Sequence, residues 1–237
     1  MDGSTRPGRS RPRRVKPRTT CALAVFGGAY GVAHVLGRTW SSTPAERRSA
    51  RPGDELVVHP TLVTNHAITI DAPAECVWPW LVQMGWHRGG WYTARWVDRL
   101  LFPANHASAD RIVAELQHLG LGDSVPDGPP ETQCGFVVAR MERDRTLVLH
   151  SREHLPLSWR ARFAASMNWS WTFSLDALDG GRTRLLIRSR AALAPRWIAA
   201  LYWMALPTDF VMARQMLQGI RRRAELTVVA PDLLGAT

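Results

Sequence analysis

The residues with the most suggestive spacing for chemistry are His150, Glu153 and His154, in the stretch HSREH. The pattern H-x-x-E-H is that of the inverted zincins, in which two histidines on one helical face bind zinc and the glutamate acts as a base. That chemistry requires a helix. Here the motif follows the strand-like run RTLVL and precedes Pro156. The sequence therefore predicts a solvated strand end and no metal site.

The remaining residue types indicate no other catalytic pattern. Cys21, Cys76 and Cys134 are widely spaced and form neither a disulfide framework nor a C-x-x-C site, so we expect small buried side chains. The sequence contains no phosphate-binding loop, no G-x-G-x-x-G and no G-x-S-x-G. It therefore identifies no catalytic residue and implies no cofactor.

Large apolar side chains alternate with small polar ones in the stretch MNWSWTFSL. Trp169, Trp171, Phe173 and Leu175 occupy every second position, and Asp-Gly-Gly at 179–181 separates this run from a second one. This pattern predicts a β-hairpin with one strongly apolar face. Such a face lies either against a filled core or against a cavity that holds a ligand.

Two further stretches could contribute to a site. Gly89 and Gly90 predict a turn that carries Trp91 and Tyr92, either as a buried turn or as the lining of a ligand site. Four arginines alternate along the second strand of the hairpin, and we expect most of them to face solvent, although one could turn inward towards an acidic ligand. These arginines are Arg182, Arg184, Arg188 and Arg190.

The elements that must position these residues follow from periodicity. Strands are predicted at 62–71 and on both sides of a turn at 142–145, in addition to the hairpin described above. Helical spacing is predicted from Pro73 to Gly85, at 92–102 and at 195–207. A final amphipathic helix carries Phe210, Ala213, Leu217, Ile220 and Ala224 at spacings of three and four. Strands framed by helices predict an α+β fold with an antiparallel sheet.

The N-terminal part of the chain differs in composition from the rest. Residues 1–20 are rich in Arg, Pro, Ser and Gly and are expected to be a disordered basic tail. The run 21–36 has no charged residue and favours an uncleaved anchor helix at 21–37, over a secretory signal, a soluble helix or a wrongly assigned start. Residues 38–60 have the composition of a linker, and the folded domain is expected from residue 61.

The charge distribution bears on partners and location. Residues 1–18 hold seven of the 30 basic and one of the 20 acidic residues, so they carry +6 of the formal net charge of +10. The folded part is only mildly basic, which gives no reason to expect nucleic acid as a partner. The charges around residues 21–36 favour a single-pass membrane protein with the main domain outside the cytoplasm.

Several stretches resemble the SRPBCC superfamily, which includes START lipid-transfer domains, birch-pollen-type allergens and bacterial polyketide cyclases. The stretches are LVTNHAITIDAPAECVWPWLVQMG, WTFSLDALDGGRTRLLIRSR and DFVMARQMLQGIRRRAE, and the similarity covers about residues 52–226. It implies a helix-grip domain at 61–226, with a curved antiparallel sheet around a long C-terminal helix, followed by a tail at 227–237. Members of this bacterial branch often carry an N-terminal membrane helix.

The resemblance also implies a function. We expect a membrane-tethered carrier or sensor for a small hydrophobic molecule, with residues 21–36 at the membrane. The alternatives are an enzyme of the cyclase or aromatase kind, and an interaction module with a filled core and no ligand. The candidate cavity-lining residues are Trp80, Trp91, Tyr92, Trp169, Trp171, Phe173, Phe210 and Leu217.

Overall fold

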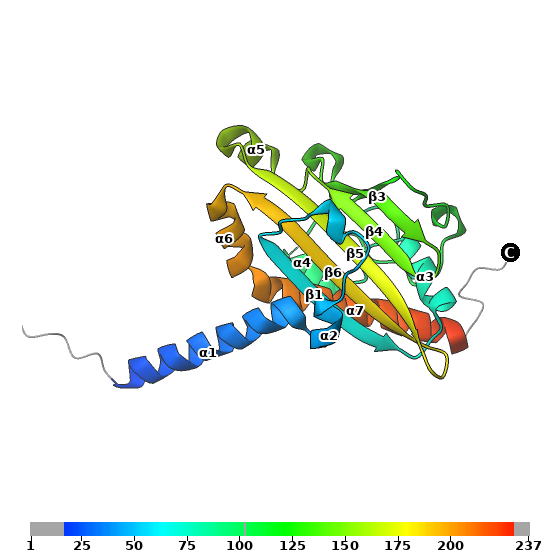
Figure 1. The fold of residues 1–237 in the computed structure, drawn as a ribbon, viewed down its shortest axis with the longest axis horizontal. Helices are drawn as coiled ribbons and strands as arrows, with labels where there is room; N and C mark the ends of the chain where they lie inside the picture. The colour runs from blue at the N-terminus through cyan, green and yellow to red at the C-terminus, as the bar shows by residue number, and fades with distance from the viewer. Residues whose placement is uncertain (1–16, 102, 230–237) are drawn as a thin grey trace, which may run out of the picture.

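A computed structural model describes residues 17–101 and 103–229, and the chain there forms an α+β fold (Figure 1). The α-helices are α1 (Pro17–Thr39), α2 (Pro44–Arg48), α3 (Ala74–Val82), α4 (Arg95–Leu101), α5 (Leu157–Phe163), α6 (Arg196–Met204) and α7 (Leu206–Val229). The strands are β1 (Leu62–Ile70), β2 (Ser124–Pro126), β3 (Gly135–Glu142), β4 (Thr146–Ser151), β5 (Ser166–Leu178) and β6 (Arg182–Ala194). Three single-turn 3₁₀ helices are η1 (Asp54–Leu56), η2 (Ala114–Leu116) and η3 (Pro130–Thr132).

The six strands form one antiparallel sheet in the order β1-β6-β5-β4-β3-β2. The first strand therefore pairs with the last, and the other strands follow one another as hairpins. Both predicted hairpins are confirmed, since β3 pairs with β4 and β5 pairs with β6. Gly180 and Gly181 have φ values of 75° and 67°, which glycine adopts without a Cβ penalty at the β5–β6 turn.

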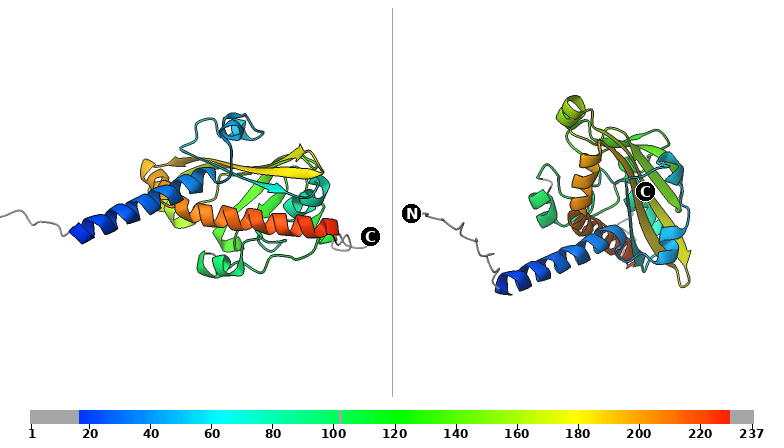
Figure 2. Two further views of the ribbon diagram at one scale, coloured as in Figure 1. Left: turned by 90° about the horizontal axis from the view of Figure 1, so that it is seen from below. Right: turned by 60° about the vertical axis from the view of Figure 1, so that its left-hand side comes forward.

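Helix α7 packs across the concave face of the sheet, which is the helix-grip arrangement (Figure 2). Leu217, Ile220 and Ala224 are fully buried on its inner face, as the spacing predicts. Helix α3 packs against α7 and contributes the fully buried Trp80 to the same core. The main core therefore lies between the sheet, α3 and α7.

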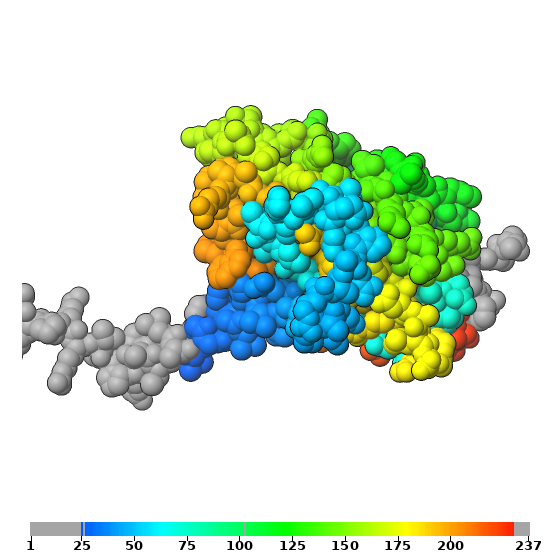
Figure 3. Space-filling model, viewed as in Figure 1, coloured from blue at the N-terminus to red at the C-terminus, as the bar shows by residue number. Residues whose placement is uncertain are grey.

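The outer face of the sheet is covered by residues 42–57, which we call the strap (Figure 3). Its centre is Arg188 on β6, whose side chain is 3% exposed. The guanidinium donates to Asn65 Oδ1 at 2.8 Å, to Asp54 Oδ2 at 2.7 Å, and to the carbonyls of Ser49 and Glu46, both at 2.8 Å. This part of the predicted linker therefore contacts the sheet.

The expectation that most of the strand arginines face solvent is wrong. Arg182 is exposed, but Arg184 is held by Glu46 of the strap, with 2.7 Å between Nε and Oε1. Arg190 donates twice to the carbonyl of Val57, at 3.0 and 3.2 Å. The alternation places these side chains on the outer face correctly. It could not show that another segment of the chain covers that face.

Helix α1 packs against α7, and Tyr30 and His34 of α1 contact α6. Within residues 17–101 and 103–229, no helix is both long enough and apolar enough to cross a membrane. Residues 1–16 of the disordered tail predicted at 1–20 lie outside the described residues, as do residues 230–237, whereas residues 17–20 belong to α1. Residues 227–229, which we placed in a C-terminal tail, belong to α7.

Candidate functional site

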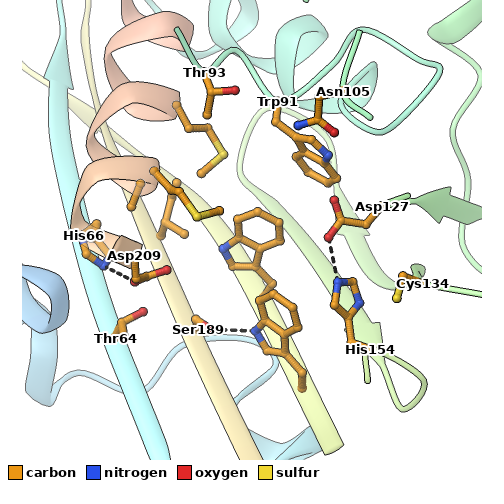
Figure 4. A pocket seen from close by; sticks show the side chains of 16 residues that line it. Thr64, His66, Trp91, Thr93, Asn105, Asp127, Cys134, His154, Ser189 and Asp209 are labelled. Atoms are coloured by element: carbon orange, nitrogen blue, oxygen red, sulfur yellow. Dashed lines mark hydrogen bonds and ion pairs between the residues drawn. The ribbon is translucent and has the colours of Figure 1, made fainter. Parts of the chain in front are cut away.

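A cavity of about 230 Å³ lies between the concave face of the sheet, α7 and the segment between α3 and β3 (Figure 4). Its lining combines aromatic, sulfur-containing and polar side chains. The lining residues are Thr64, His66, Trp91, Thr93, Asn105, Asp127, Cys134, His154, Trp169, Trp171, Ile187, Ser189, Asp209, Met212, Ala213 and Met216.

Three indole rings form an apolar wall of the cavity. Trp169 and Trp171 project from the same face of β5, and their rings stack with centroids 5.6 Å apart. Trp171 also lies 5.3 Å from Trp91, measured between ring centroids. The Trp169 Nε1 donates to Ser189 Oγ at 2.6 Å, which satisfies the polar edge of this ring. The wall therefore presents flat apolar surface.

A histidine–aspartate pair lies at the β3–β4 side of the cavity. His154 Nε2 is 2.7 Å from Asp127 Oδ2, and the two side chains are 12% and 25% exposed. The imidazole is enclosed by aromatic rings, with centroid distances of 4.6 Å to Phe136 and 4.7 Å to Trp169. Because an ionised carboxylate only accepts hydrogen bonds, His154 Nε2 donates here, and in the neutral ring Nδ1 keeps a free lone pair.

A second pair of the same kind joins β1 to the start of α7. His66 Nε2 is 3.2 Å from Asp209 Oδ2. The His66 side chain is 2% exposed, whereas that of Asp209 is 42% exposed. Asp209 also lies in the first turn of α7, where a negative charge interacts favourably with the helix dipole. The cavity is thus flanked by two oriented imidazoles on different elements of the fold (Figure 4).

Three buried nitrogen atoms of cavity-lining residues have no hydrogen-bond partner among the described residues. They are Nδ1 of His66, Nδ1 of His154 and Nε1 of Trp91. A buried polar group without a partner costs about 1–3 kcal/mol. The indole N–H can only donate, and each imidazole Nδ1 can accept in the tautomer described above. A ligand with oxygen substituents could therefore satisfy these atoms.

The loop that carries Trp91 is held by buried polar contacts. Gln83 is fully buried, donates to the carbonyl of Arg111 at 3.1 Å and accepts from the backbone N–H of Val113 at 3.0 Å. Arg88 donates to the carbonyls of Met84 and Val82, both at 3.0 Å, and burial lowers the pKa of its guanidinium. These contacts fix the turn that places Trp91 in the cavity wall.

Tyr92, the next residue, packs against α7. Its hydroxyl donates to the carbonyl of Trp80 at 2.8 Å, and the Arg223 guanidinium lies 4.9 Å from its ring centroid. Burial raises the pKa of this phenol, so the hydroxyl stays protonated as a donor. The backbone of Tyr92 also approaches α7 closely at Gly219. Helix α7 therefore supports the Trp91 loop from behind.

The structure separates the predicted site residues into two groups. Trp91, Trp169 and Trp171 line the cavity. Trp80, Tyr92, Phe173 and Leu217 are fully buried in the core next to it, and Phe210 contacts Trp40 with ring centroids 6.4 Å apart. These last five are not among the lining residues.

The histidine motif is divided between two faces of the sheet. His150 Nε2 lies 2.6 Å from Asn168 Oδ1, and Asn168 in turn donates to the carbonyl of Leu56 in the strap, so His150 is on the outer face. His154 lines the cavity on the inner face. The two histidines therefore have separate partners, and placing His154 at a solvated strand end is wrong. Among the described residues no three His, Cys, Asp or Glu side chains are grouped closely enough to hold a metal ion.

Sequence reasoning missed the polar residues of the site. His66 alternates with Ile68 and Ile70 in β1, so a histidine on a core-facing strand position was the available signal. Asp209 directly precedes the apolar stripe of α7. Asp127 lies in a loop rich in proline and glycine, where nothing in the sequence indicates that it meets His154.

The fold and the cavity together define a helix-grip domain with an internal, aromatic-walled cavity. No family model matches the chain, and no curated protein matches it. Solved structures with similar folds include norcoclaurine synthase from Thalictrum flavum in complex with dopamine and hydroxybenzaldehyde. The sequence identity is 13% and the TM-score is 0.42, and the match covers 77% of this chain and 95% of that one.

A protein from Arthrobacter aurescens has 16% identity and a TM-score of 0.41, with coverage of 70% of this chain and 87% of that one. The Zhui aromatase/cyclase from Streptomyces sp. R1128 has 18% identity and a TM-score of 0.34, with coverage of 74% and 99%. At such values the likeness concerns the fold alone.

Proposed function

We propose that this protein binds a small, flat, largely apolar molecule that carries oxygen substituents. The observation that carries the proposal is the lining of the cavity. Trp91, Trp169 and Trp171 offer faces on which a planar ring can stack, and the buried unpaired nitrogens of Trp91, His66 and His154 offer polar partners. A carbonyl or ether oxygen would accept from the indole N–H, and a hydroxyl would donate to an imidazole Nδ1.

The volume of the cavity limits the size of the ligand. Ligand pockets are commonly about 300–1,000 Å³, and an apolar cavity of about 150 Å³ holds benzene. A cavity of about 230 Å³ therefore has room for one or two fused rings with small substituents. The same volume argues against the third alternative, a module with a filled core.

A matched pair of probes tests this proposal. Naphthalene and a naphthol have the same ring system, but only the naphthol carries a hydroxyl. We expect the naphthol to bind more tightly in isothermal titration, and His154→Phe, which removes Nδ1, to reduce that preference without abolishing naphthalene binding. Failure of the wild-type chain to bind either compound would refute the proposal.

A second function is favoured by a specific observation, the His154–Asp127 pair. An imidazole whose Nε2 is held by a carboxylate keeps Nδ1 available as a general base, and the carboxylate stabilises the imidazolium formed when the base takes a proton. With the Trp91 N–H as donor to a ligand carbonyl, this arrangement suits removal of a proton from the carbon next to that carbonyl. A base of this kind in the cavity favours the cyclase or aromatase alternative.

Deuterium exchange tests the catalytic proposal without knowledge of the natural substrate. α-Tetralone is a bicyclic ketone of suitable size, and NMR in D₂O follows exchange of its acidic C–H. We expect exchange catalysed by the wild-type chain to fall by about 100-fold or more in His154→Gln and in Asp127→Asn, the usual range for loss of a general base. Equal rates with and without protein would leave ligand binding as the function.

Tethering to a membrane through residues 21–36, as a single pass with the main domain outside the cytoplasm, stays a prediction. Cell fractionation of the full chain tests it. If the chain is soluble after a high-salt wash, the anchor prediction is wrong.

A further inference from the structure

An exposed apolar edge runs along α5 and α6, which follow one another down one side of the molecule in the view of Figure 3. Six large side chains form this edge, and each is between 41% and 55% exposed. The apolar edge consists of Leu157, Phe163, Trp197, Leu201, Trp203 and Met204. Single exposed apolar residues are ordinary, but a contiguous group of this kind marks an interaction surface.

The spacing within α6 explains why its apolar residues cannot all be buried. Trp197, Leu201 and Met204 recur at intervals of four and three, which places them on one face of the helix. The side that faces the protein carries Ile198, which is fully buried, and Tyr202, which packs in the same cluster as Trp169 of the cavity wall. Helix α6 is therefore apolar on its inner and outer sides, and the described residues of this chain cover only the inner side.

The apolar edge is continuous with its neighbours. Phe163 meets Trp197 edge to face, with ring centroids 5.3 Å apart. At the other end of α6, the Tyr30 hydroxyl of α1 donates to the carbonyl of Met204 at 2.8 Å, and the His34 ring packs on Trp203 at 3.9 Å. Helices α1, α5 and α6 thus present a single surface.

The charges around the apolar edge indicate what covers it. Helix α5 carries Arg160 and Arg162, helix α6 carries Arg196, and neither helix contains an acidic residue. Glu153, just before α5, pairs with Arg160 at 3.5 Å between Oε1 and Nη2, whereas Arg162 and Arg196 are exposed and form no ion pair among the described residues. Two copies of this chain meeting through the edge would therefore bring four uncompensated arginines together. Anionic lipid headgroups match both features, because tryptophan rings favour the membrane interface and arginines near the surface are attracted to anionic lipid.

We propose that the apolar edge docks on the surface of an anionic lipid bilayer, with the α6 face of Trp197, Leu201 and Met204 inserted among the headgroups. The outer side of α6 forms part of this edge, and Tyr202 on its inner side packs in the same cluster as Trp169 of the cavity wall. Docking therefore places the cavity next to the membrane. The docking itself does not depend on the proposed ligand or on any catalysis.

A matched pair of substitutions in the full chain tests this proposal. Leu201 and Leu178 are 41% and 38% exposed, but Leu178 lies at the β5–β6 turn, the end of the hairpin far from α6. Sedimentation with phosphatidylcholine vesicles containing phosphatidylglycerol measures binding. We expect Leu201→Glu to weaken binding by about tenfold or more, and Leu178→Glu, which adds the same charge, to bind as the wild type does.

The arginines provide a second measurement. Arg162→Gln with Arg196→Gln removes the two exposed, unpaired arginines of the edge and should weaken binding to the anionic vesicles by about 30-fold, since each basic residue near the surface contributes about a fivefold factor. If Leu201→Glu and Leu178→Glu bind equally, the basic N-terminal tail accounts for binding and the proposal is wrong. If wild-type chains instead form a dimer that Leu201→Glu dissociates, the edge is an interface between copies and the proposal also fails.

Discussion

Replacing Gly219 by alanine tests whether α7 supports the cavity wall. A Cβ at this position would lie 2.0 Å from the carbonyl oxygen of Tyr92 and 2.8 Å from its Cβ, where ordinary contacts begin at about 3.4 Å. Alanine inside a helix is favoured over glycine by about 0.5–1 kcal/mol, whereas overpacking costs about 1–3 kcal/mol. Because the obstacle is backbone, we expect the upper end of that cost and a net loss of about 2 kcal/mol.

Tyr92 has little freedom to move away from an added methyl group. Its φ is +58°, its hydroxyl is bonded to the carbonyl of Trp80, and Arg223 lies over its ring. Relief of the clash would therefore displace the loop that carries Trp91. We expect Gly219→Ala to weaken binding of the naphthol probe as well as to lower the free energy of unfolding.

Urea unfolding, followed by circular dichroism, measures the stability change, and Gly31→Ala in α1 is the matched control. Outside the backbone of its own helix, no atom of the described residues lies within 4 Å of a Cβ at Gly31, so the same substitution should leave stability unchanged or raise it by up to about 1 kcal/mol. If Gly219→Ala is as stable as the wild type and binds the probe equally well, α7 and the Trp91 loop are not in the contact described.

Three further predictions concern the core and the strap. Phe173→Ala should lower the free energy of unfolding by about 3–5 kcal/mol, because Phe173 is fully buried. Trp171→Ala should lower it by less, because one side of Trp171 borders the cavity. Urea unfolding compares the two variants, and an equal or larger loss for Trp171→Ala would indicate that Trp171 lies in packed core. Arg188→Leu should lower the free energy of unfolding by about 3–5 kcal/mol in the same assay, because it removes the cation that pairs with Asp54 and a donor to the strap carbonyls of Ser49 and Glu46. An unchanged stability would show that the strap does not depend on this residue. Burial alone would raise the pKa of Glu46, but hydrogen bonds from Arg184 and Thr43 outweigh it and lower that pKa. Glu46 therefore stabilises the fold above the unfolded pKa of about 4.5, and this contribution is lost as the pH falls through the lower folded pKa. Glu46→Gln should be less stable than wild type at pH 7, and urea unfolding should show the difference shrinking as the pH falls below 4.5; a difference that does not change with pH would refute this.

The fold could be predicted further from the sequence than the site could. Alternation in β5 and β6, the Asp-Gly-Gly turn and the stripe of α7 are local patterns, so each element follows from residues close together in the chain. The aromatic wall was predicted for the same reason, because Trp169 and Trp171 share a strand face.

The polar half of the site could not be predicted, because it depends on pairings across long sequence separations. Asp127 and His154 are 27 residues apart, and His66 and Asp209 are 143 apart. Neither member of a pair has a local pattern that identifies its partner. The packing of the strap over Arg188 could not be predicted for the same reason, since a segment rich in proline and charge gives no sign of the face of the sheet on which it packs.

The strap has a consequence for how the chain folds as it is synthesised. Its sheet-side hydrogen-bond partners include Asn168, Thr172 and Arg188, which all lie in the last third of the sequence. The N-terminal residues emerge from the ribosome first, yet the surface that receives them exists only after the β5–β6 hairpin has been made. Because domains are synthesised from the N-terminus at about 5–20 residues per second, the strap waits several seconds or more without its partners. During that interval the strap, which carries Arg47, Arg48 and Arg51, is accessible to other binding partners and to proteases.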